Sequence, residues 1–416
     1  PGGLVDQFYG PLIEFLARTH RVEVFAYDWR QSVRAAAARL AERLEALVAR
    51  AEAEHQPVHI VAHSMGGLVV RALMADGGRG AAVWARIARL PGSRFLMLGT
   101  PNFGSHEAVR WLTGHNPTQA RLALLDFTQS TTDIIDLVRT YPGLLELLPF
   151  ADSEPDFADA GLWTALRRQL GAAWRTADAA TLKTVRDTWD RLRAAAVDPR
   201  LACYVAGCQP ATVIGYQVSG EDDPWPLGRS RIDFVATARG DGTVSWASGA
   251  LPGVPVWYAE DTAHDFLCAQ TRAFEGYLDL LMTGTTRRLP SSPPAGARAA
   301  GADGADFLLR RAPPADGIPQ PGDLALFGFG GSPAPVEDAA EIRTAVTVRV
   351  RHCELSYARH PVMVGHYAGD TIVSAEASMD RRMDGALSRS QLLGRYPGAA
   401  GTHGVFIPRE MHQHPQ

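Results

Sequence analysis

The chain has 416 residues, of which 46% are hydrophobic, so it is long enough for two or three domains with a sizeable core. Its 41 Lys and Arg residues against 45 Asp and Glu residues give a net charge of −4, which offers no electrostatic basis for binding nucleic acid. No apolar run approaches membrane-spanning length, and the first residues show no signal peptide.

The cysteines are too few and too scattered for a disulfide framework or for a zinc site with paired C-x-x-C spacing. They are Cys203, Cys208, Cys268 and Cys353. Isolated thiols fit a reducing interior, so we expect a cytoplasmic protein. The chain begins with Pro1-Gly2-Gly3 in place of an initiator methionine, and we expect it to be a piece of a longer protein.

The first part of the chain alternates short apolar runs with a helical pattern. The runs 21–29 and 94–100 flank a β-branched run that ends at Ala62. Between the run 21–29 and the β-branched run, the pattern over 32–53 places apolar side chains on one face of a helix. Strand, helix, strand, helix and strand in this order predict an α/β fold with a mostly parallel sheet.

The sequence VAHSMGG, residues 61–67, lies where the middle strand changes directly into a helix, and it places Ser64 at the turn. A strained turn of this kind lifts the hydroxyl above the sheet and needs small residues on both sides, here Ala62 and Gly66. The amide of Met65 would point at the same space and stabilise an oxyanion. Taken alone, the pattern fits a helix N-cap serine in a tight loop equally well.

From residue 105 to about 195 only helical patterns occur. A helical insertion in a parallel sheet lies over the carboxyl ends of the strands, where ligands bind in open α/β folds, so we expect a cap. One of its helices carries an apolar stripe that would line an acyl pocket or pack on the domain, and packing is the interpretation we favour. The stripe comprises Leu162, Trp163, Leu166, Leu170 and Trp174.

Strand-like runs return after the helical segment, and a last helix follows near 270–282. The runs are 201–207, 211–218, 231–237 and 254–260. From residue 284 the composition changes, and 290–335 carries nine of the 28 prolines among many Ala and Gly residues, which is typical of a linker. Alternating and helix-prone stretches after it predict a second, smaller αβ unit.

A serine hydroxyl is a poor nucleophile at neutral pH, so Ser64 needs a base, and the base needs an acid that holds its tautomer. In α/β hydrolases the chain order is serine, acid, histidine, with the last two on loops after late strands. Asp241 follows the run 231–237, and His264 follows the run 254–260. Both the order and the positions fit.

Each partner also has a simpler interpretation. Asp241 between two glycines would fit a hairpin turn, and His264 would fit a capping or core histidine. Three other aspartates are rival acids: Asp233, Asp261 and Asp265. The last of them adjoins the base, from where it would orient the ring poorly. His63, next to the nucleophile, is expected to face away from it and to support the site.

Five sequence motifs follow one another between about residues 8 and 282. In chain order they are YDWR, VHIVAHSMGGLVVR, LMLGTPNFGS, GDGTVSW and TAHDFL. In this combination they resemble the α/β-hydrolase lipases and acyltransferases related to lecithin:cholesterol acyltransferase and to the deacylase of glycosylphosphatidylinositol anchors. The resemblance implies Ser64 as nucleophile, Asp241 as acid, His264 as base and the Met65 amide as an oxyanion donor. Three further residues would support the site: His63, Gly66 and Thr100.

In that family a second oxyanion donor comes from a Pro-Gly loop upstream of the helix that here would hold Tyr9 to Arg18. Pro1-Gly2-Gly3 would be a remnant of this loop, or the loop lies outside this piece. The segment Thr100-Pro101-Asn102 would lie beside the acyl site.

We therefore predict an α/β-hydrolase domain over 1–283 with a helical cap at about 105–200, a Pro/Ala/Gly-rich linker over 284–338 and an αβ module over 339–416. The last part resembles a macro-like module of multidomain bacterial proteins, and we expect it to continue beyond Gln416. The spacing of its histidines matches no metal-binding pattern on a helix. They are His352, His360 and His366.

Together these features predict a serine esterase or lipase that cleaves an acyl ester, lipid-like in character, without a metal or organic cofactor. Acyl transfer to an acceptor other than water would use the same residues. A binding or signalling module with secondary catalysis is the alternative from another class. Peripheral membrane contact stays open, and the sequence names no partner for the C-terminal module.

Overall fold

The computed structural model describes residues 6–116, 131–170, 177–218, 232–294 and 306–309, and near the carboxyl end 376, 379–380, 383 and 385–392. Two compact units divide the chain, Pro1–Arg311 and Ala312–Gln416. In the second unit, α15 spans Ala386–Leu392, and Asp380 Oδ1 accepts the Leu387 amide at 2.8 Å near its start. The remainder of the predicted macro-like module, including its three histidines, lies outside the described residues.

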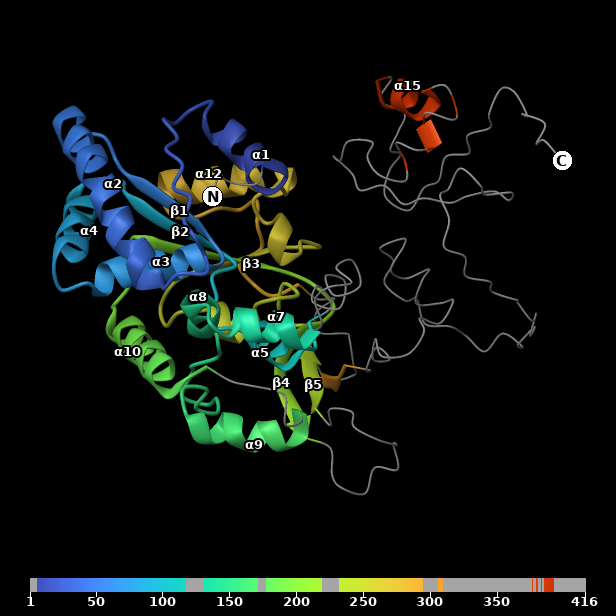
Figure 1. The fold of residues 1–416 in the computed structure, drawn as a ribbon. Coiled ribbons are helices and arrows are strands. Elements are labelled where there is room, and N and C mark those ends of the chain that lie inside the picture. The colour runs from blue at the N-terminus through green and yellow to red at the C-terminus, as the bar shows by residue number, and fades with distance from the viewer. Residues whose placement is uncertain are drawn as a thin grey trace. The chain divides into compact units, whose positions relative to one another are not determined.

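A parallel sheet lies at the centre of the first unit (Figure 1). Its strands are β1 (His59–His63), β2 (Arg94–Leu98), β3 (Ala202–Gly207) and β6 (Val256–Ala259), hydrogen-bonded in that order and all parallel. The carboxyl ends of all four strands therefore meet at one edge of the sheet. This confirms the predicted α/β fold and its parallel sheet.

Helices cover both faces of this sheet (Figure 1). One core contains α2 (Val33–Glu54), α3 (Met65–Ala75) and α4 (Arg79–Arg89), and the other contains α1 (Asp6–Leu16) and α12 (Phe274–Thr283). Within β2, Phe95 and Met97 pack into the first core, and Leu96 and Leu98 pack into the second. Alternate side chains are apolar on both sides because both faces of the sheet are buried.

The segment between β2 and β3, here named the insertion (residues 105–200), has helices as its regular secondary structure where it is described. Its helices are α5 (His106–Thr113), α7 (Thr131–Val138), α8 (Pro142–Glu146), α9 (Ala160–Leu170) and α10 (Ala179–Ala194). In α9, Trp163 and Leu166 are buried, and Trp163 Nε1 donates to Phe157 O at 2.8 Å. These two residues of the apolar stripe pack inside the unit; Trp174 and the Leu170 side chain lie outside the description.

A second sheet is antiparallel and separate from the first. It contains β4 (Thr212–Val218), β5 (Ile232–Thr237) and β7 (Phe307–Leu308) in the order β4-β5-β7. The runs at 211–218 and 231–237 are thus strands, as predicted, although they do not extend the parallel sheet. The helix α11 (Trp246–Gly249) and the helix α12 complete the unit.

The prediction of a strand at 21–29 was wrong. Residues 21–28 have no regular secondary structure, and Val24 is 45% exposed. A strand needs a neighbouring backbone to pair with, and β1 is the last strand of the described parallel ladder on its side. An apolar run alone cannot supply that partner.

Parts of the stretch predicted to be a linker pack on the first unit. Leu289 is buried among α12 and its neighbours, Pro290 O accepts the amide of Tyr258 at 3.0 Å, and β7 pairs with β5. The boundary at 283/284 stays a prediction. In the described ranges, no helix is both long enough and apolar enough to cross a membrane.

Candidate active site

Ser64 lies at the turn between β1 and α3 with a strained backbone. Its φ of 52° and ψ of −131° are unusual for a residue other than glycine. The side chain makes no capping hydrogen bond to α3. Ser64 therefore occupies the N-cap position of α3, but its hydroxyl lies 2.7 Å from His264 Nε2 and does not cap the helix.

The close approach at the turn occurs at Gly67. A Cβ on Gly67 would clash with the buried side chain of Thr100, whereas a Cβ on Gly66 would make ordinary contacts of 3.7 Å with Ala62 and 3.8 Å with Tyr27. Thr100 therefore packs closely against the first turn of α3, and its supporting role stays a prediction. Among the described residues its hydroxyl has no hydrogen-bond partner.

His264 begins the short 3₁₀ helix η1 (His264–Phe266) that follows β6, and its Nδ1 lies 2.8 Å from Asp241 Oδ2. Both residues are buried, with 5% and 2% of their surface exposed. Burial lowers the pKa of His264, but the charge and hydrogen bond of Asp241, together with Asp265, outweigh it and raise the pKa above 6.5. Since the carboxylate accepts from Nδ1, Nε2 is free to accept the Ser64 proton.

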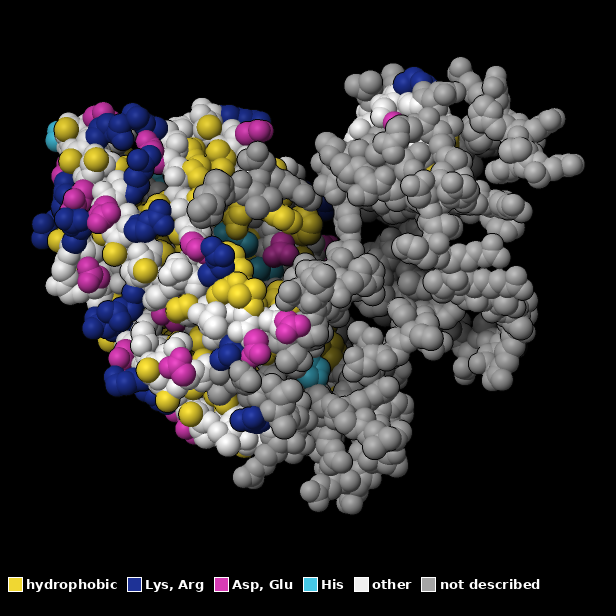
Figure 2. Space-filling model, viewed as in Figure 1, with side chains coloured by type: hydrophobic (Ala, Val, Ile, Leu, Met, Phe, Trp, Pro, Cys, Tyr) yellow, Lys and Arg dark blue, Asp and Glu magenta, His cyan; other side chains and the backbone are white. Residues whose placement is uncertain are grey.

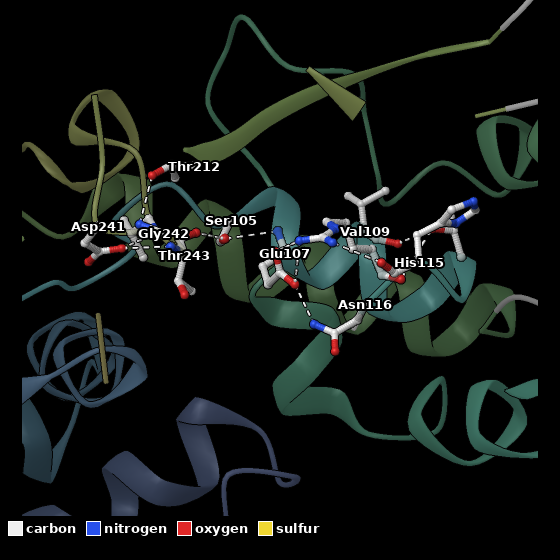
Figure 3. Close-up of polar contacts among 12 residues, drawn as sticks. Ser105, Glu107, Val109, His115, Asn116, Thr212, Asp241, Gly242 and Thr243 are labelled. Carbon is white, nitrogen blue, oxygen red and sulfur yellow. Dashed lines mark hydrogen bonds and ion pairs between the residues drawn. The ribbon is translucent and has the colours of Figure 1, made fainter. Parts of the chain in front are cut away.

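Asp241 is held by its own turn (Figure 3). Its Oδ1 accepts the amides of Thr243 at 3.0 Å and Val244 at 2.7 Å, and its backbone carbonyl accepts the amide of His264 at 2.9 Å. An antiparallel bridge between Gly240 and Ser245 closes this turn as in a short hairpin, and the chain then enters α11 and not a second strand. The acid in contact with the His264 ring is Asp241, and not one of the rivals Asp233, Asp261 and Asp265.

Sequence reasoning missed Gly99, which follows β2 directly. Its φ is +59°, and a Cβ there would lie 2.9 Å from Asp241 Oδ2, 3.1 Å from His264 Nδ1 and 2.7 Å from Leu267 Cδ1. The missing side chain leaves the space in which the Asp241–His264 hydrogen bond forms. A glycine directly after a strand in LMLGT was the available signal.

His63 contacts the backbone of His264 and a tyrosine that the sequence did not single out. Its Nε2 lies 2.9 Å from His264 O, and its Nδ1 lies 3.1 Å from the hydroxyl of Tyr9 on α1. A carbonyl only accepts, so Nε2 carries the proton. Burial, then the nearby His264, lowers the pKa of His63 to about 3, so the ring is neutral and Nδ1 accepts from Tyr9.

Met65 begins α3, so its amide is one of the N–H groups that an α-helix leaves without an intrahelical partner. Its side chain reaches α8, where a Cβ on Gly143 would lie 2.8 Å from Met65 Cε and would clash with the carbonyl of Trp29. The predicted second donor at Pro1-Gly2-Gly3 lies outside the described residues.

In the space-filling view, hydrophobic side chains gather around a hollow between α1 and the insertion, with histidine surface at its floor (Figure 2). Phe266 is 49% exposed and packs edge-on against Phe8 at 5.6 Å between ring centroids. Trp29 is also 49% exposed and packs on Tyr141 at 5.7 Å. Within the described ranges, no group of three or more His, Cys, Asp or Glu side chains could hold a metal ion.

Residues 14–169 match the family model of lecithin:cholesterol acyltransferase, a range that contains β1, Ser64, α3 and β2. The chain has the lipase-type α/β-hydrolase fold. No curated protein sequence matches this chain.

Solved structures give weak likenesses to this chain. The Tle4–Tli4 complex has a TM-score of 0.41 at 15% identity and covers 62% of this chain and 68% of that chain. The mature lipase BlEst2 of Bacillus licheniformis has a TM-score of 0.31 at 15% identity, with 61% and 75% covered. Phospholipase PlaB from Legionella pneumophila has a TM-score of 0.32 at 13% identity, with 68% and 62% covered.

Proposed function

We propose that this chain is a serine esterase or lipase that cleaves an acyl ester through an acyl-enzyme, with Ser64 as nucleophile, His264 as general base and Asp241 as the orienting acid. The observation that carries the proposal is the unbroken path of two hydrogen bonds, 2.7 Å from Ser64 Oγ to His264 Nε2 and 2.8 Å from His264 Nδ1 to Asp241 Oδ2.

In the first half-reaction, Ser64 Oγ attacks the acyl carbonyl carbon while His264 Nε2 takes the hydroxyl proton. The imidazolium that forms is stabilised by the buried Asp241 carboxylate, and the Met65 amide donates to the oxyanion. When the tetrahedral intermediate collapses, the C–O bond to the alcohol breaks and the alcohol leaves with the proton from Nε2. Water then attacks the acyl-enzyme by the same proton path and releases the acid.

An apolar, lipid-like acyl group suits the surroundings of Ser64. The exposed rings of Phe266 and Trp29 offer apolar surface, and Phe266 comes two residues after the base. We therefore expect turnover to rise with the length of the acyl chain before it levels off.

Acyl transfer is the second candidate, because the family model that matches residues 14–169 bears the name of an acyltransferase. Transfer would use the same three residues with an alcohol in place of water. Product analysis with candidate acceptor alcohols separates the two reactions: free acid as the sole acyl product would exclude transfer.

The test measures hydrolysis of short and long p-nitrophenyl esters together with fluorophosphonate labelling. We expect Ser64→Ala to abolish labelling and to lower kcat about 10⁶-fold, and Asp241→Asn, which keeps the shape of the acid, to lower it about 10⁴-fold. His264→Ala should resemble the serine variant. A folded parent protein without turnover or labelling would contradict the proposal and favour a binding role.

A further inference from the structure

The turn that carries Asp241 is joined to the first residue of the insertion by contacts that the reaction scheme does not use (Figure 3). The hydroxyl of Ser105 donates to the carbonyl of Thr243, and the Thr243 amide donates to Asp241 Oδ1 at 3.0 Å. A carbonyl only accepts, so the direction of the Ser105 hydrogen bond is fixed. Two hydrogen bonds and one residue thus separate Ser105 from the acid.

Ser105 also belongs to the insertion. It is the N-cap of α5, and its Oγ accepts the Glu107 amide at 3.1 Å. Its own amide donates to Leu147 O at 2.8 Å, directly after α8. With 7% of its surface exposed, this serine has little room to move away from either partner.

Residues next to Ser105 also form hydrogen bonds to the segment 243–249. The contact of Ser105 is therefore part of a continuous seam between 102–105 and 243–249. Asn102 Nδ2 donates to Gly249 O at 2.6 Å, and the Phe103 amide donates to Ser248 O at 2.9 Å. The Ser248 hydroxyl donates to the carbonyl of Gly104. Within this seam, Ser105 is the residue whose side chain forms a hydrogen bond to the turn that carries Asp241, at the carbonyl of Thr243.

We propose that Ser105 is a positioning residue for Asp241, the acid of the proposed reaction. Its hydrogen bond to the Thr243 carbonyl keeps the turn in place, so that the amides of Thr243 and Val244 donate to Asp241 Oδ1. The other carboxylate oxygen, Oδ2, then faces His264 Nδ1. This inference rests on the proposed function. Without the Ser105 hydroxyl the turn loses its link to α5, and the carboxylate can rotate away from the ring.

Ser105→Ala should lower kcat roughly 10- to 100-fold with KM nearly unchanged. The acid limb of kcat/KM should move to lower pH, because Asp241 raises the pKa of His264 against the effect of burial. The charged and titratable groups that act on this ring are Asp241, Asp265 and His63, and only the contact with Asp241 is altered. Ser105→Thr retains the hydroxyl and should restore both values.

Asp178→Ala is the matched control, because Asp178 is also an N-cap, accepting the amides of Ala180 at 3.0 Å and Thr181 at 2.9 Å, but on α10. Loss of this cap should lower the melting temperature while kcat and the acid limb stay as in the parent. Ser105→Gly serves if the alanine variant does not fold, since glycine is tolerated at an N-cap.

The downfield NMR resonance of the His264 Nδ1 proton, assigned by its loss in His264→Ala, reports on the Asp241 contact whether or not the chain hydrolyses an ester. We expect this resonance to shift or vanish in Ser105→Ala and Ser105→Gly and to persist in Asp178→Ala. A folded Ser105 variant with the parent's resonance overturns the inference. A parent without turnover overturns the proposed function alone, and the two failures are thereby distinguished.

Discussion

Gly99 determines how closely β2 approaches the acid and the base. Gly99→Ala would place a Cβ 2.9 Å from Asp241 Oδ2 and would strain a backbone with φ of +59°. We expect kcat to fall by roughly 100-fold or more, because the Asp241–His264 contact must open. Steady-state kinetics with a p-nitrophenyl ester measures this.

The control for backbone strain is Gly92→Ala. Gly92 has φ of +87°, and the nearest atom to a Cβ there would be Pro57 Cβ at 3.6 Å. Both variants should lower the melting temperature through the unfavourable φ, but only the Gly99 variant should lose turnover. A Gly99→Ala protein with the parent's kcat would contradict this account.

His63 makes the free energy of unfolding depend on pH. Its pKa is lowered to about 3 by burial, whereas in the unfolded chain it is near 6.5. The unfolded state therefore binds the proton first, and stability that is complete above pH 6.5 is lost as the pH falls toward 3. Between pH 7 and pH 5 this linkage amounts to about 2 kcal/mol.

His63→Gln retains an N–H donor for His264 O and an acceptor for Tyr9 and cannot titrate. Urea unfolding at pH 7 and pH 5 should show a loss for the parent that exceeds the loss for this variant by about 2 kcal/mol. The raised pKa of His264 acts in the opposite direction in both proteins and cancels in the comparison. If both proteins lose the same free energy of unfolding between pH 7 and pH 5, protonation of His63 does not destabilise the folded state.

At the scale of elements, Arg71 joins α3 and α10 to the loop after β2, without a carboxylate partner among the described residues. From α3 it donates to Asn102 O at 2.6 Å and to Leu192 O of α10 at 2.5 Å, and burial lowers its pKa to about 10. Arg71→Met keeps most of the apolar volume but leaves two buried carbonyls unpaired. We expect a loss of about 2–4 kcal/mol in the free energy of unfolding.

Arg193→Met is the comparison for this prediction. Arg193 lies on α10 and, like Arg71, donates to a carbonyl, that of Phe150 at 2.5 Å, but 36% of its side chain is exposed. Its loss should cost about 1 kcal/mol or less. If urea unfolding gives the two variants the same stability, Arg71 does not hold α10 against α3.

The sequence was sufficient for elements whose signal is local. The apolar runs at 94–100 and 254–260 became β2 and β6, and the turn around Ser64 could be recognised from its strand and helix. The sequence was not sufficient where strand formation or pairing depends on a segment far away in the chain. The run 21–29 lacks a strand beside it, and alternation in β4 and β5 does not state that they pair with each other in a separate sheet.

The same limit applies to the candidate site. The sequence order of serine, acid and histidine led to Ser64, Asp241 and His264, which the structure brings into contact, while their catalytic role stays a proposal. The contacts Tyr9–His63 and Ser105–Thr243 join common residue types across 54 and 138 positions. No local pattern distinguishes such pairs from surface hydroxyls.

At the scale of the whole molecule, residues beyond 283 pack on the first unit. A chain cut after Arg311 keeps Leu289, the Tyr258–Pro290 hydrogen bond and β7, whereas a chain cut after Thr283 loses all three. We expect the shorter chain to be less stable by about 2–4 kcal/mol, from the buried leucine and the lost hydrogen bonds. Equal denaturation midpoints for the two truncated chains would favour a unit that ends near residue 283.

The distance along the chain between Ser64 and His264, 200 residues, has a consequence for folding kinetics. The two side chains meet only after β1, β2, β3 and β6 have paired across the insertion, so their contact is among the last to form when the chain refolds. Recovery of reactivity at Ser64 should therefore lag behind the recovery of helical circular dichroism, and a fluorophosphonate added at successive times would record when the sheet closes.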